Sequence, residues 1–126
     1  MRIRELMTAD PCCIQREEPL RNAHRLMRVR KVRHLPVLHG EHLVGLVSER
    51  DLFLLETVRS VDPEKEPVEE AMTEDPFAVA PDANVREVLE EMLAKRYGSA
   101  MVVERGRVVG IFTRADALRA LHQLLR

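Results

Sequence analysis

A hydroxyl and a carboxylate recur at the same spacing at two places in the chain. Ser48 stands three residues before Asp51, and Thr113 stands three residues before Asp116. This is the spacing of a helix capping box, in which the hydroxyl caps the helix and the third helical residue bonds back to the cap. A helix N-terminus also presents unbonded N–H groups and a positive dipole, which suit a phosphate. An aspartate one turn into the helix can accept two hydrogen bonds from a ribose diol, so capping and nucleotide binding are compatible.

The other residue types that do chemistry form no catalytic or metal-binding pattern. The five histidines lack a spaced carboxylate, nucleophile or further ligand that would complete a triad or a metal set. They are His24, His34, His39, His42 and His122. Cys12 and Cys13 are neighbours, which rarely form a disulfide, and no second cysteine pair completes a zinc site. We therefore expect no enzyme, no metal ion and no catalytic cofactor, and we interpret both cysteines as small buried hydrophobic side chains.

The chain repeats itself at an offset of 65 residues. At this offset Met7–Pro11 aligns with Met72–Pro76, and Val44–Ser48 aligns with Val109–Thr113 without a gap. The two aspartates of the capping motifs align in the same register. Self-similarity over this length indicates two copies of one structural unit, at about residues 3–56 and 68–121.

Both copies contain the same order of expected elements, which is a helical turn, a strand, a helix, a hairpin and a second helix. In the first copy these elements are expected at Ile3–Met7, Cys12–Gln15, Leu20–Lys31, Leu35–Leu38 with Leu43–Val47, and Ser48 to about Thr57. In the second copy they are expected at Val68–Met72, Phe77–Ala80, Val85–Arg96, Ala100–Val103 with Val108–Phe112, and Thr113 to about Leu125. Each capping motif thus follows an apolar strand, headed by Gly45 or Gly110, and opens a helix.

The fold class that follows is α/β (α+β), with two tandem β-α-β-β-α repeats. Each repeat would have a three-stranded sheet, and roughly 55 residues are too few to bury its apolar face alone. We therefore expect the two repeats to pack sheet to sheet about a pseudo-two-fold axis. The expected boundaries are residues 1–57 for the first repeat, 58–67 for a charged linker and 68–126 for the second repeat.

Composition excludes several classes of protein. Of the 126 residues, 45% are hydrophobic and 33% are charged, and the formal net charge is −1. This profile is typical of a globular chain rather than a disordered or fibrous one. No apolar run approaches the ~20 residues of a membrane span, and no secretory apolar segment follows Met1. We expect a cytoplasmic protein with no membrane association.

The motifs together resemble the CBS domain, named after cystathionine β-synthase. The strings that carry the resemblance are Met7-Thr-Ala-Asp-Pro, His34-Leu-Pro-Val, Gly45-Leu-Val-Ser-Glu-Arg-Asp51, Met72-Thr-Glu-Asp-Pro and Gly110-Ile-Phe-Thr-Arg-Ala-Asp116. The resemblance covers residues 3–121 and implies a CBS pair, or Bateman module, similar to the stand-alone pairs of bacteria and archaea. Such pairs commonly bind AMP, ADP, ATP or S-adenosylmethionine and usually regulate an enzyme, channel or transporter. The implied function is a ligand-sensing module that signals to an effector protein, whose identity stays open.

The resemblance also implies where the ligand binds. In the family, the Ser/Thr-x-x-Asp motif of one copy faces the Met-Thr strand and the hairpin entry of the other copy. Carried over, one cleft would hold Thr113, Arg114 and Asp116 with Thr8, Ile14, Arg33, His34 and Leu35. The other would hold Ser48, Arg50 and Asp51 with Thr73, Val79, Gly98, Ser99 and Ala100. Ile14 or Val79 would flank the adenine.

The two implied clefts differ in charge. Arg33 and His34 occupy the positions that Gly98 and Ser99 take in the second copy. Cationic groups near a phosphate stabilise it strongly in a partly dry cleft. We therefore expect the Asp116 cleft to prefer the more phosphorylated ligand and to contribute more to binding.

Other functions stay open alongside ligand sensing. The basic run 21–34 carries six Lys or Arg residues and no acidic residue, a pattern that nucleic-acid-binding proteins share. The lack of aromatic residues beside it argues against binding single strands. The run could instead dock on the acidic segment 62–75 of another subunit. A structural or dimerising module with vestigial clefts is a further alternative.

The last helix of each copy carries more apolar residues than one thin sheet can cover, which predicts a homodimer. These residues are Leu52, Leu55, Ala117, Leu118, Leu121 and Leu125.

Overall fold

The chain folds into two compact units, and each unit draws on both sequence repeats. The computed structural model describes all residues from Met1 to Arg126. Unit 1 contains Met1–Pro11 and Phe77–Arg126, and unit 2 contains Cys12–Pro76. The first segment of the chain therefore joins the second repeat in space, and residues 58–76 join the first repeat.

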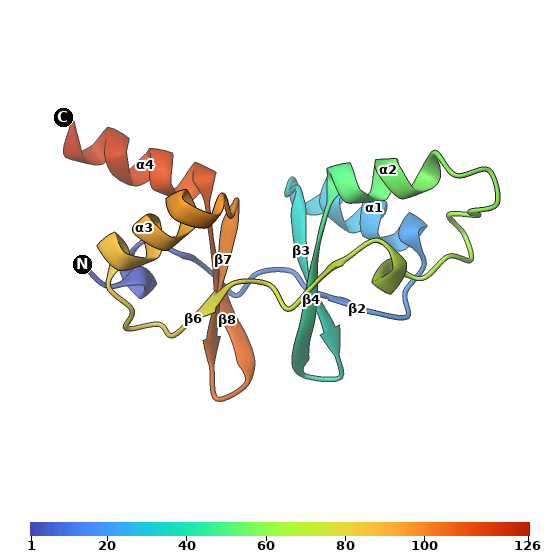
Figure 1. Cartoon of the computed structure of the whole chain (residues 1–126), viewed down its shortest axis with the longest axis horizontal. Coiled ribbons are helices and arrows are strands. Elements are labelled where there is room, and N and C mark those ends of the chain that lie inside the picture. The colour runs from blue at the N-terminus through green and yellow to red at the C-terminus, as the bar shows by residue number, and fades with distance from the viewer. The chain divides into compact units, whose positions relative to one another are not determined.

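Unit 2 is a four-stranded sheet with two helices on one face of its hairpin (Figure 1). Its elements are β2 (Ile14–Gln15), α1 (Leu20–Arg30), β3 (His34–His39), β4 (His42–Ser48), α2 (Glu49–Glu56), the 3-10 turn η2 (Val68–Glu70) and β5 (Thr73–Glu74). The strand order is β2-β3-β4-β5, with β2 parallel to β3 and the other pairs antiparallel.

Unit 1 has the same architecture and is built from the remaining strands and helices of the chain. They are the 3-10 turn η1 (Ile3–Glu5), β1 (Thr8–Ala9), β6 (Ala78–Val79), α3 (Val85–Lys95), β7 (Ser99–Glu104), β8 (Arg107–Thr113) and α4 (Arg114–Leu124). The strand order is β1-β8-β7-β6, with β6 parallel to β7. Figure 1 shows α3 and α4 on the same side of the β7–β8 hairpin.

The expectation of three strands per sheet was wrong, because the Met-Thr segments add an edge strand to each sheet. Thr8 lies opposite Ile111 on β8, and Thr73 lies opposite Leu46 on β4. Only the first three residues of each expected helical turn are helical, and the strand begins after two further residues. Two-residue strands are too short to show a hydrophobic alternation, so the periodicity could not reveal them.

A glycine in each central strand makes room for the methionine of the edge segment. A Cβ built at Gly110 would overlap the side chain of Met7, and a Cβ at Gly45 would overlap that of Met72. Each methionine therefore packs directly on the backbone of the glycine. This contact explains why Met-Thr and Gly recur together in both repeats.

The segment expected as a charged linker, residues 58–67, provides hydrogen-bond acceptors for the first amides of α1. The amide of Leu20 donates to the carbonyl of Glu66 at 2.9 Å, and the amide of Arg21 donates to that of Pro63 at 2.9 Å. In unit 1 the matching bond runs from the amide of Val85 to the carbonyl of Met1 at 3.1 Å. Helix N-terminal amides need such partners, so residues 58–67 are a structural part of unit 2.

Each unit has its own aliphatic core between its helices and its sheet. In unit 2 the fully buried residues include Leu20, Leu35, Val37, Val47 and Leu52. In unit 1 the corresponding cluster is centred on Ile3, Ala100, Val102 and Phe112. The two cores leave the N-terminal ends of α2 and α4 at the rim of their sheets, where both capping motifs lie.

Candidate functional site

The Asp116 carboxylate is the most heavily bonded polar group of unit 1. Its Oδ2 accepts from the Thr113 amide at 2.8 Å and from the Thr113 hydroxyl at 3.1 Å. Its Oδ1 accepts from the Thr8 hydroxyl at 2.8 Å and from the guanidinium of Arg119. Asp116 is only 4% exposed. The carboxylate therefore ties the start of α4 to the edge strand β1 and to an arginine one turn along the helix.

The Asp51 carboxylate of unit 2 holds the same position in its fold with fewer partners. Its Oδ2 accepts from the Ser48 amide at 2.9 Å, and the Asp51 amide donates to the Ser48 hydroxyl at 3.0 Å. These two bonds form the reciprocal capping box that the spacing predicts. Asp51 is half-buried, and within its unit the backbone amide of Ser48 is the single donor to its carboxylate.

The strand that enters each hairpin brings further expected residues to the same end of the sheet. In unit 1, Ser99 lies opposite Thr113 and is buried, and Gly98 lies beneath the guanidinium of Arg114. A Cβ on Gly98 would sit 3.8 Å from the Arg114 Cζ atom. Each capping motif thus has the hairpin entry of its own repeat beside it.

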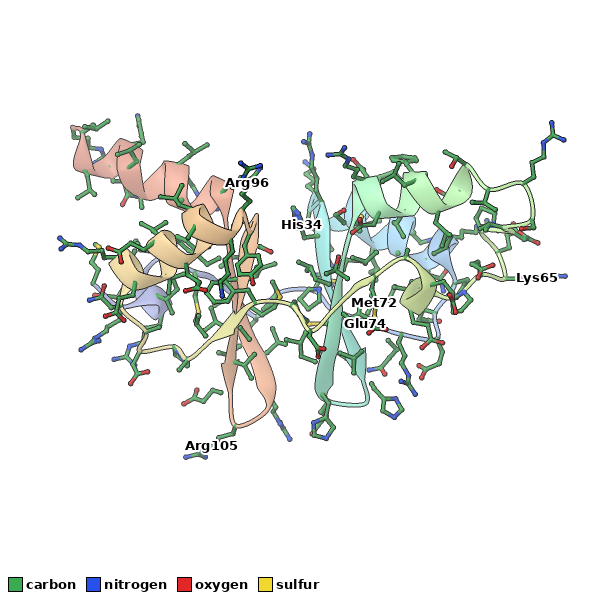
Figure 2. All side chains as sticks on the ribbon, viewed as in Figure 1. His34, Lys65, Met72, Glu74, Arg96 and Arg105 are labelled. Atoms are coloured by element: carbon green, nitrogen blue, oxygen red, sulfur yellow. The ribbon has the colours of Figure 1, made fainter.

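Unit 2 shows the same arrangement with more positive charge. His34 lies opposite Ser48, and the carbonyl of Arg33 accepts from the Glu49 amide at 2.9 Å. Figure 2 places His34 at the start of β3, beside the end of β4 where α2 begins. Arg33 and Arg50 are exposed beside it.

The expected residues divide between the two units as follows. Unit 1 holds Thr8, Val79, Gly98, Ser99, Ala100, Thr113, Arg114 and Asp116. Unit 2 holds Ile14, Arg33, His34, Leu35, Ser48, Arg50, Asp51 and Thr73. The grouping of these residues into two ligand clefts stays a prediction.

Several apolar residues that were expected to line the ligand clefts are buried in the hydrophobic cores. Leu35 and Ala100 are fully buried core members, and Ile14 is 4% exposed in the core of unit 2. Val79 is half-buried against the core of unit 1 and Thr73 is exposed on its edge strand. A ligand can therefore reach the side chains of Val79 and Thr73 more readily than those of Leu35 and Ala100.

Sequence reasoning missed Arg119, which pairs with the carboxylate of Asp116 from three residues along α4. The signal was present in the repeat, because the residue 65 positions earlier is Leu54, which has no polar group. Comparison of the two copies beyond the capping motifs would have marked this difference in charge.

The basic run of α1 is partly paired within its own unit. Arg21 forms an ion pair with Glu64 at 2.6 Å, and the Nε2 atom of His24 lies 2.8 Å from a carboxylate oxygen of Glu56. A cavity of about 620 Å³ opens beside these pairs. It is lined by Arg21, His24, Arg25, Arg28, Glu56, Asp62, Pro63 and Glu64. The acidic segment 62–75 therefore contacts α1 of the same chain, and mixed charge surrounds the run.

The two neighbouring cysteines lie just before β2. No disulfide joins Cys12 and Cys13, and both are half-buried rather than fully buried as expected. Burial, with a smaller contribution from Cys12, raises the pKa of the Cys13 thiol to about 11. No three His, Cys, Asp or Glu side chains come together as metal ligands would, and no helix has the length and hydropathy to cross a membrane.

This chain matches some known proteins over most of their length and others over only a small part of their length. The CBS domain matches residues 3–56 and 68–123. The protein YlbB of Bacillus subtilis is 34% identical over 117 residues, which are 91% of this chain and 78% of YlbB. Two enzymes are 32% identical, an inosine-5'-monophosphate dehydrogenase of Korarchaeum cryptofilum and an A-adding tRNA nucleotidyltransferase of Aquifex aeolicus. This chain spans only 22% and 15% of their respective lengths.

Solved structures agree closely with the fold. A putative acetoin utilization protein (AcuB) from Vibrio cholerae has a TM-score of 0.89 at 32% identity, covering 99% of this chain and 93% of AcuB. CBSX2, solved in complex with AMP, has a TM-score of 0.82 at 26% identity, covering 99% and 98% of the two chains. The CBS domain pair of MJ0100, in complex with 5-methylthioadenosine and S-adenosyl-L-methionine, shares the fold at 22% identity, with a TM-score of 0.85. With both repeats matched and both sheets reproduced, the chain belongs to the CBS domain family and carries its domains as a tandem pair.

Proposed function

We propose that this CBS pair is a regulatory module that binds an adenosyl ligand, either an adenine nucleotide or S-adenosylmethionine, and signals to a partner protein. The observation that carries the proposal is the placement of Asp51 and Asp116 at the start of α2 and α4. A carboxylate there can accept hydrogen bonds from a ribose diol, while the helix N-terminus favours a nearby phosphate. The same pair of groups occurs in both units.

Exposed arginines add to the case for a phosphorylated ligand. Arg114 is the first residue of α4 and Arg50 is the second residue of α2, and both are exposed. Charge-assisted hydrogen bonds from arginine to phosphate are short and strong, and the fork of the guanidinium can contact two oxygens. Carried over from the family, Arg33 and His34 would add to this charge.

The ligands of two relatives support an adenosyl ligand. CBSX2 was solved with AMP, and its structural match with this protein covers nearly all of both chains. MJ0100 was solved with S-adenosyl-L-methionine, on a more distant sequence with the same fold. The shared part of these ligands is adenosine, so the proposal rests on the ribose and adenine and leaves the phosphate number to experiment.

The proposed role is non-catalytic and depends on a partner. The histidines outside the hairpin entries include His24, which is paired with Glu56, and His39, which lies on the surface near Glu17. Neither pair has a nucleophile beside it. A module of this kind acts by changing its conformation or stability on binding, and an effector protein reads the change.

A second candidate, a dimerising module without a ligand, is favoured by apolar side chains left exposed on the helices. On α4 these are Leu118, Leu121 and Leu124, and on α2 they are Phe53 and Leu54. Nucleic-acid binding through the run 21–34 is less well supported, because Glu56, Asp62 and Glu64 line the same cavity as its arginines and would repel phosphates.

A ligand scan separates these functions. The melting temperature would be measured with AMP, ADP, ATP, S-adenosylmethionine and NADH, followed by calorimetry with the best ligand. A ligand at 100 times its Kd stabilises the folded state by about 2.7 kcal/mol if it binds only that state. We expect this gain for an adenine nucleotide, and its loss when Asp51 and Asp116 are both replaced by Ala.

The control for this scan is Asp82→Ala, which removes an exposed carboxylate elsewhere in unit 1. That variant should keep the full shift. No shift with any adenosyl ligand would leave the dimerising module as the better function.

A further inference from the structure

The two aspartate centres differ in how many acceptor positions they leave open. An ionised carboxylate offers about four lone-pair positions on its two oxygens. At Asp116 all four are taken, by the Thr113 amide, the Thr113 hydroxyl, the Thr8 hydroxyl and the Arg119 guanidinium. At Asp51 the Ser48 amide takes one. Because a ribose diol must donate two hydrogen bonds, it finds free acceptors at Asp51 and none at Asp116.

Arg119 is the member of this set that separates the two centres, because the hydroxyls of Thr8 and Thr113 can rotate away from the carboxylate and accept hydrogen bonds themselves, whereas a guanidinium can only donate. The amide donor is common to both units, and both motifs have a hydroxyl at the cap. The position of Arg119 is Leu54 in the first repeat, a side chain with no donor. The charged partner of Asp116 is therefore a property of the second repeat alone.

The two partners of this pair differ in their exposure to solvent. The side chain of Asp116 is 3% exposed, whereas that of Arg119 is 65% exposed. The guanidinium lies on the outside and the carboxylate beneath it. An exposed arginine can turn away without moving the backbone, but it then gives up a charge-assisted hydrogen bond, which is stronger than a neutral one.

We propose that Arg119 is a specificity-determining residue that closes the Asp116 centre to ribose, so that the first adenosyl ligand binds at Asp51. This inference rests on the proposed function and reverses the ranking expected from the sequence, which favoured Asp116 because of the charge of Arg33 and His34. The ligand at Asp116 must displace Arg119, so this centre binds more weakly and fills second.

The test isolates each centre by substitution and uses AMP as the probe. Calorimetry would compare the wild type, D51A, and the double variants D51A/R119L and D51A/R86L. R119L copies Leu54 into the second repeat. R86L is the matched control, because Arg86 is another exposed helical arginine of unit 1 with no carboxylate partner. Both substitutions remove the same charge.

We expect D51A to bind AMP at least tenfold more weakly than the wild type. R119L should then restore about tenfold in affinity, and R86L should restore nothing. If the R119L change weakens AMP binding further, Arg119 contacts the phosphate and the inference is wrong. Equal affinities of D51A and D51A/R119L would also overturn it.

A reciprocal variant covers the case in which D51A disturbs the start of α2. L54R, in an otherwise native chain, places an arginine three residues after Asp51, as Arg119 stands after Asp116. It should weaken the stronger AMP site about tenfold, while L54A, which removes the same apolar surface without a donor, should not. Unchanged affinity in L54R would contradict the inference.

The failure of this inference differs from that of the proposed function. If AMP binds to the wild type but the R119L, D51A and L54R changes do not alter its affinity as expected, the role of Arg119 alone is overturned. Absence of binding of AMP to the wild type and to D51A/R119L alike would overturn both, since opening Asp116 would then create no site.

Discussion

At the scale of single residues, partners within hydrogen-bond distance decide what a side chain can do. Asp51 and Asp116 have the same type, the same repeat position and the same helix position, yet one is bonded once and the other four times. The three extra bonds come from Arg119 on α4 and from the hydroxyls of Thr8 and Thr113. Equivalent motifs in a repeat therefore need not be equivalent sites.

The neighbouring cysteines give a prediction at this scale. The pKa of Cys13 is raised from 9.0 to about 11, so at pH 8 its thiolate fraction is about a hundredfold below that of an ordinary thiol. A higher pKa also makes the thiolate more nucleophilic, which offsets roughly tenfold of this loss. We expect Cys13 in a C12S chain to react with Ellman's reagent roughly tenfold more slowly when folded than in urea. The folded rate should keep rising well above pH 9, because burial, the larger cause of the raised pKa, remains in the C12S chain.

The measurement is a stopped-flow rate at several pH values. A folded rate that levels off near pH 9 would show that burial does not hold the proton on Cys13.

At the scale of elements, the sequence predicts most of what the structure contains. Both long helices of each repeat and both hairpins were expected within a few residues of their observed bounds, because each has a clear apolar period and a capping or turn signal. The edge strands Thr8–Ala9 and Thr73–Glu74 were not, because two residues carry no period. The exchange of these segments between repeats was implied by the family resemblance, which grouped Thr8 with Asp116 and Thr73 with Asp51, but the hydrophobic periodicity alone does not reveal it.

The candidate site likewise has contacts that the sequence predicts and contacts that it does not. The spacing of Ser48 with Asp51 and of Thr113 with Asp116 predicted the bonds at both helix starts. Residues three apart on a helix, such as Asp116 and Arg119, are able to pair. Whether they do depends on the directions of their side chains, and the sequence of the helix does not give these directions.

The contact of Gly110 with Met7 yields an element-scale prediction. A Cβ at position 110 overlaps Met7, so G110A must push β1 or its methionine aside. Overpacking costs about 1–3 kcal/mol, and the lower end applies here because all three atoms nearest to the new Cβ belong to the flexible Met7 side chain. We expect G110A to lower the free energy of unfolding by this amount in urea titrations, and M7A/G110A to recover part of it because the clash is gone.

The control for this pair of variants is M7A alone, which loses packing without creating a clash. Additive effects of M7A and G110A in the double variant would show that the two residues do not meet.

At the scale of the whole molecule, neither sequence repeat is a complete folding unit. Unit 2 needs η2 and β5, and it needs the carbonyls of Pro63 and Glu66 that close α1. All of these follow residue 57, where the first sequence repeat was expected to end. A repeat cut at that residue would leave β4 as an open edge and the first turn of α1 without partners.

The fragment that folds should therefore be 12–76 rather than 1–57. We expect 12–76 to keep its helical circular dichroism signal and to unfold cooperatively in urea, and 1–57 to do neither. The two fragments share residues 12–57 and differ by residues 1–11 and 58–76, of which only 58–76 belong to unit 2. Equal stability of the two fragments would restore the sequence boundary at 57 as the domain boundary.

The exposed helices predict a homodimer. Leu52, which the sequence placed on the dimer surface, is fully buried in its own core, but Leu118 and Leu121 on α4 are 66% and 51% exposed. We expect sedimentation at micromolar concentration to give a dimer, and L118E/L121E to give a monomer because charge in a buried apolar contact is costly. R105E, at the tip of the β7–β8 hairpin (Figure 2), is the control and should stay dimeric. A monomeric wild type would refute the dimer.

The two repeats differ most in charge at the hairpin entry, and this difference predicts a preference for phosphate. Arg33 and His34 stand where the second repeat has Gly98 and Ser99, and Arg33 is exposed beside the start of α2. R33G/H34S copies the second repeat into the first. Because a charge-assisted hydrogen bond contributes roughly 1.5–3 kcal/mol when well placed, the double variant should lose about tenfold or more of the preference for ATP over adenosine. Raising the salt concentration should lower the wild-type preference in the same direction, since part of the attraction is screened. Calorimetry with both ligands at two ionic strengths gives the ratio, and a ratio that the substitution leaves unchanged would make this turn an ordinary solvated basic surface.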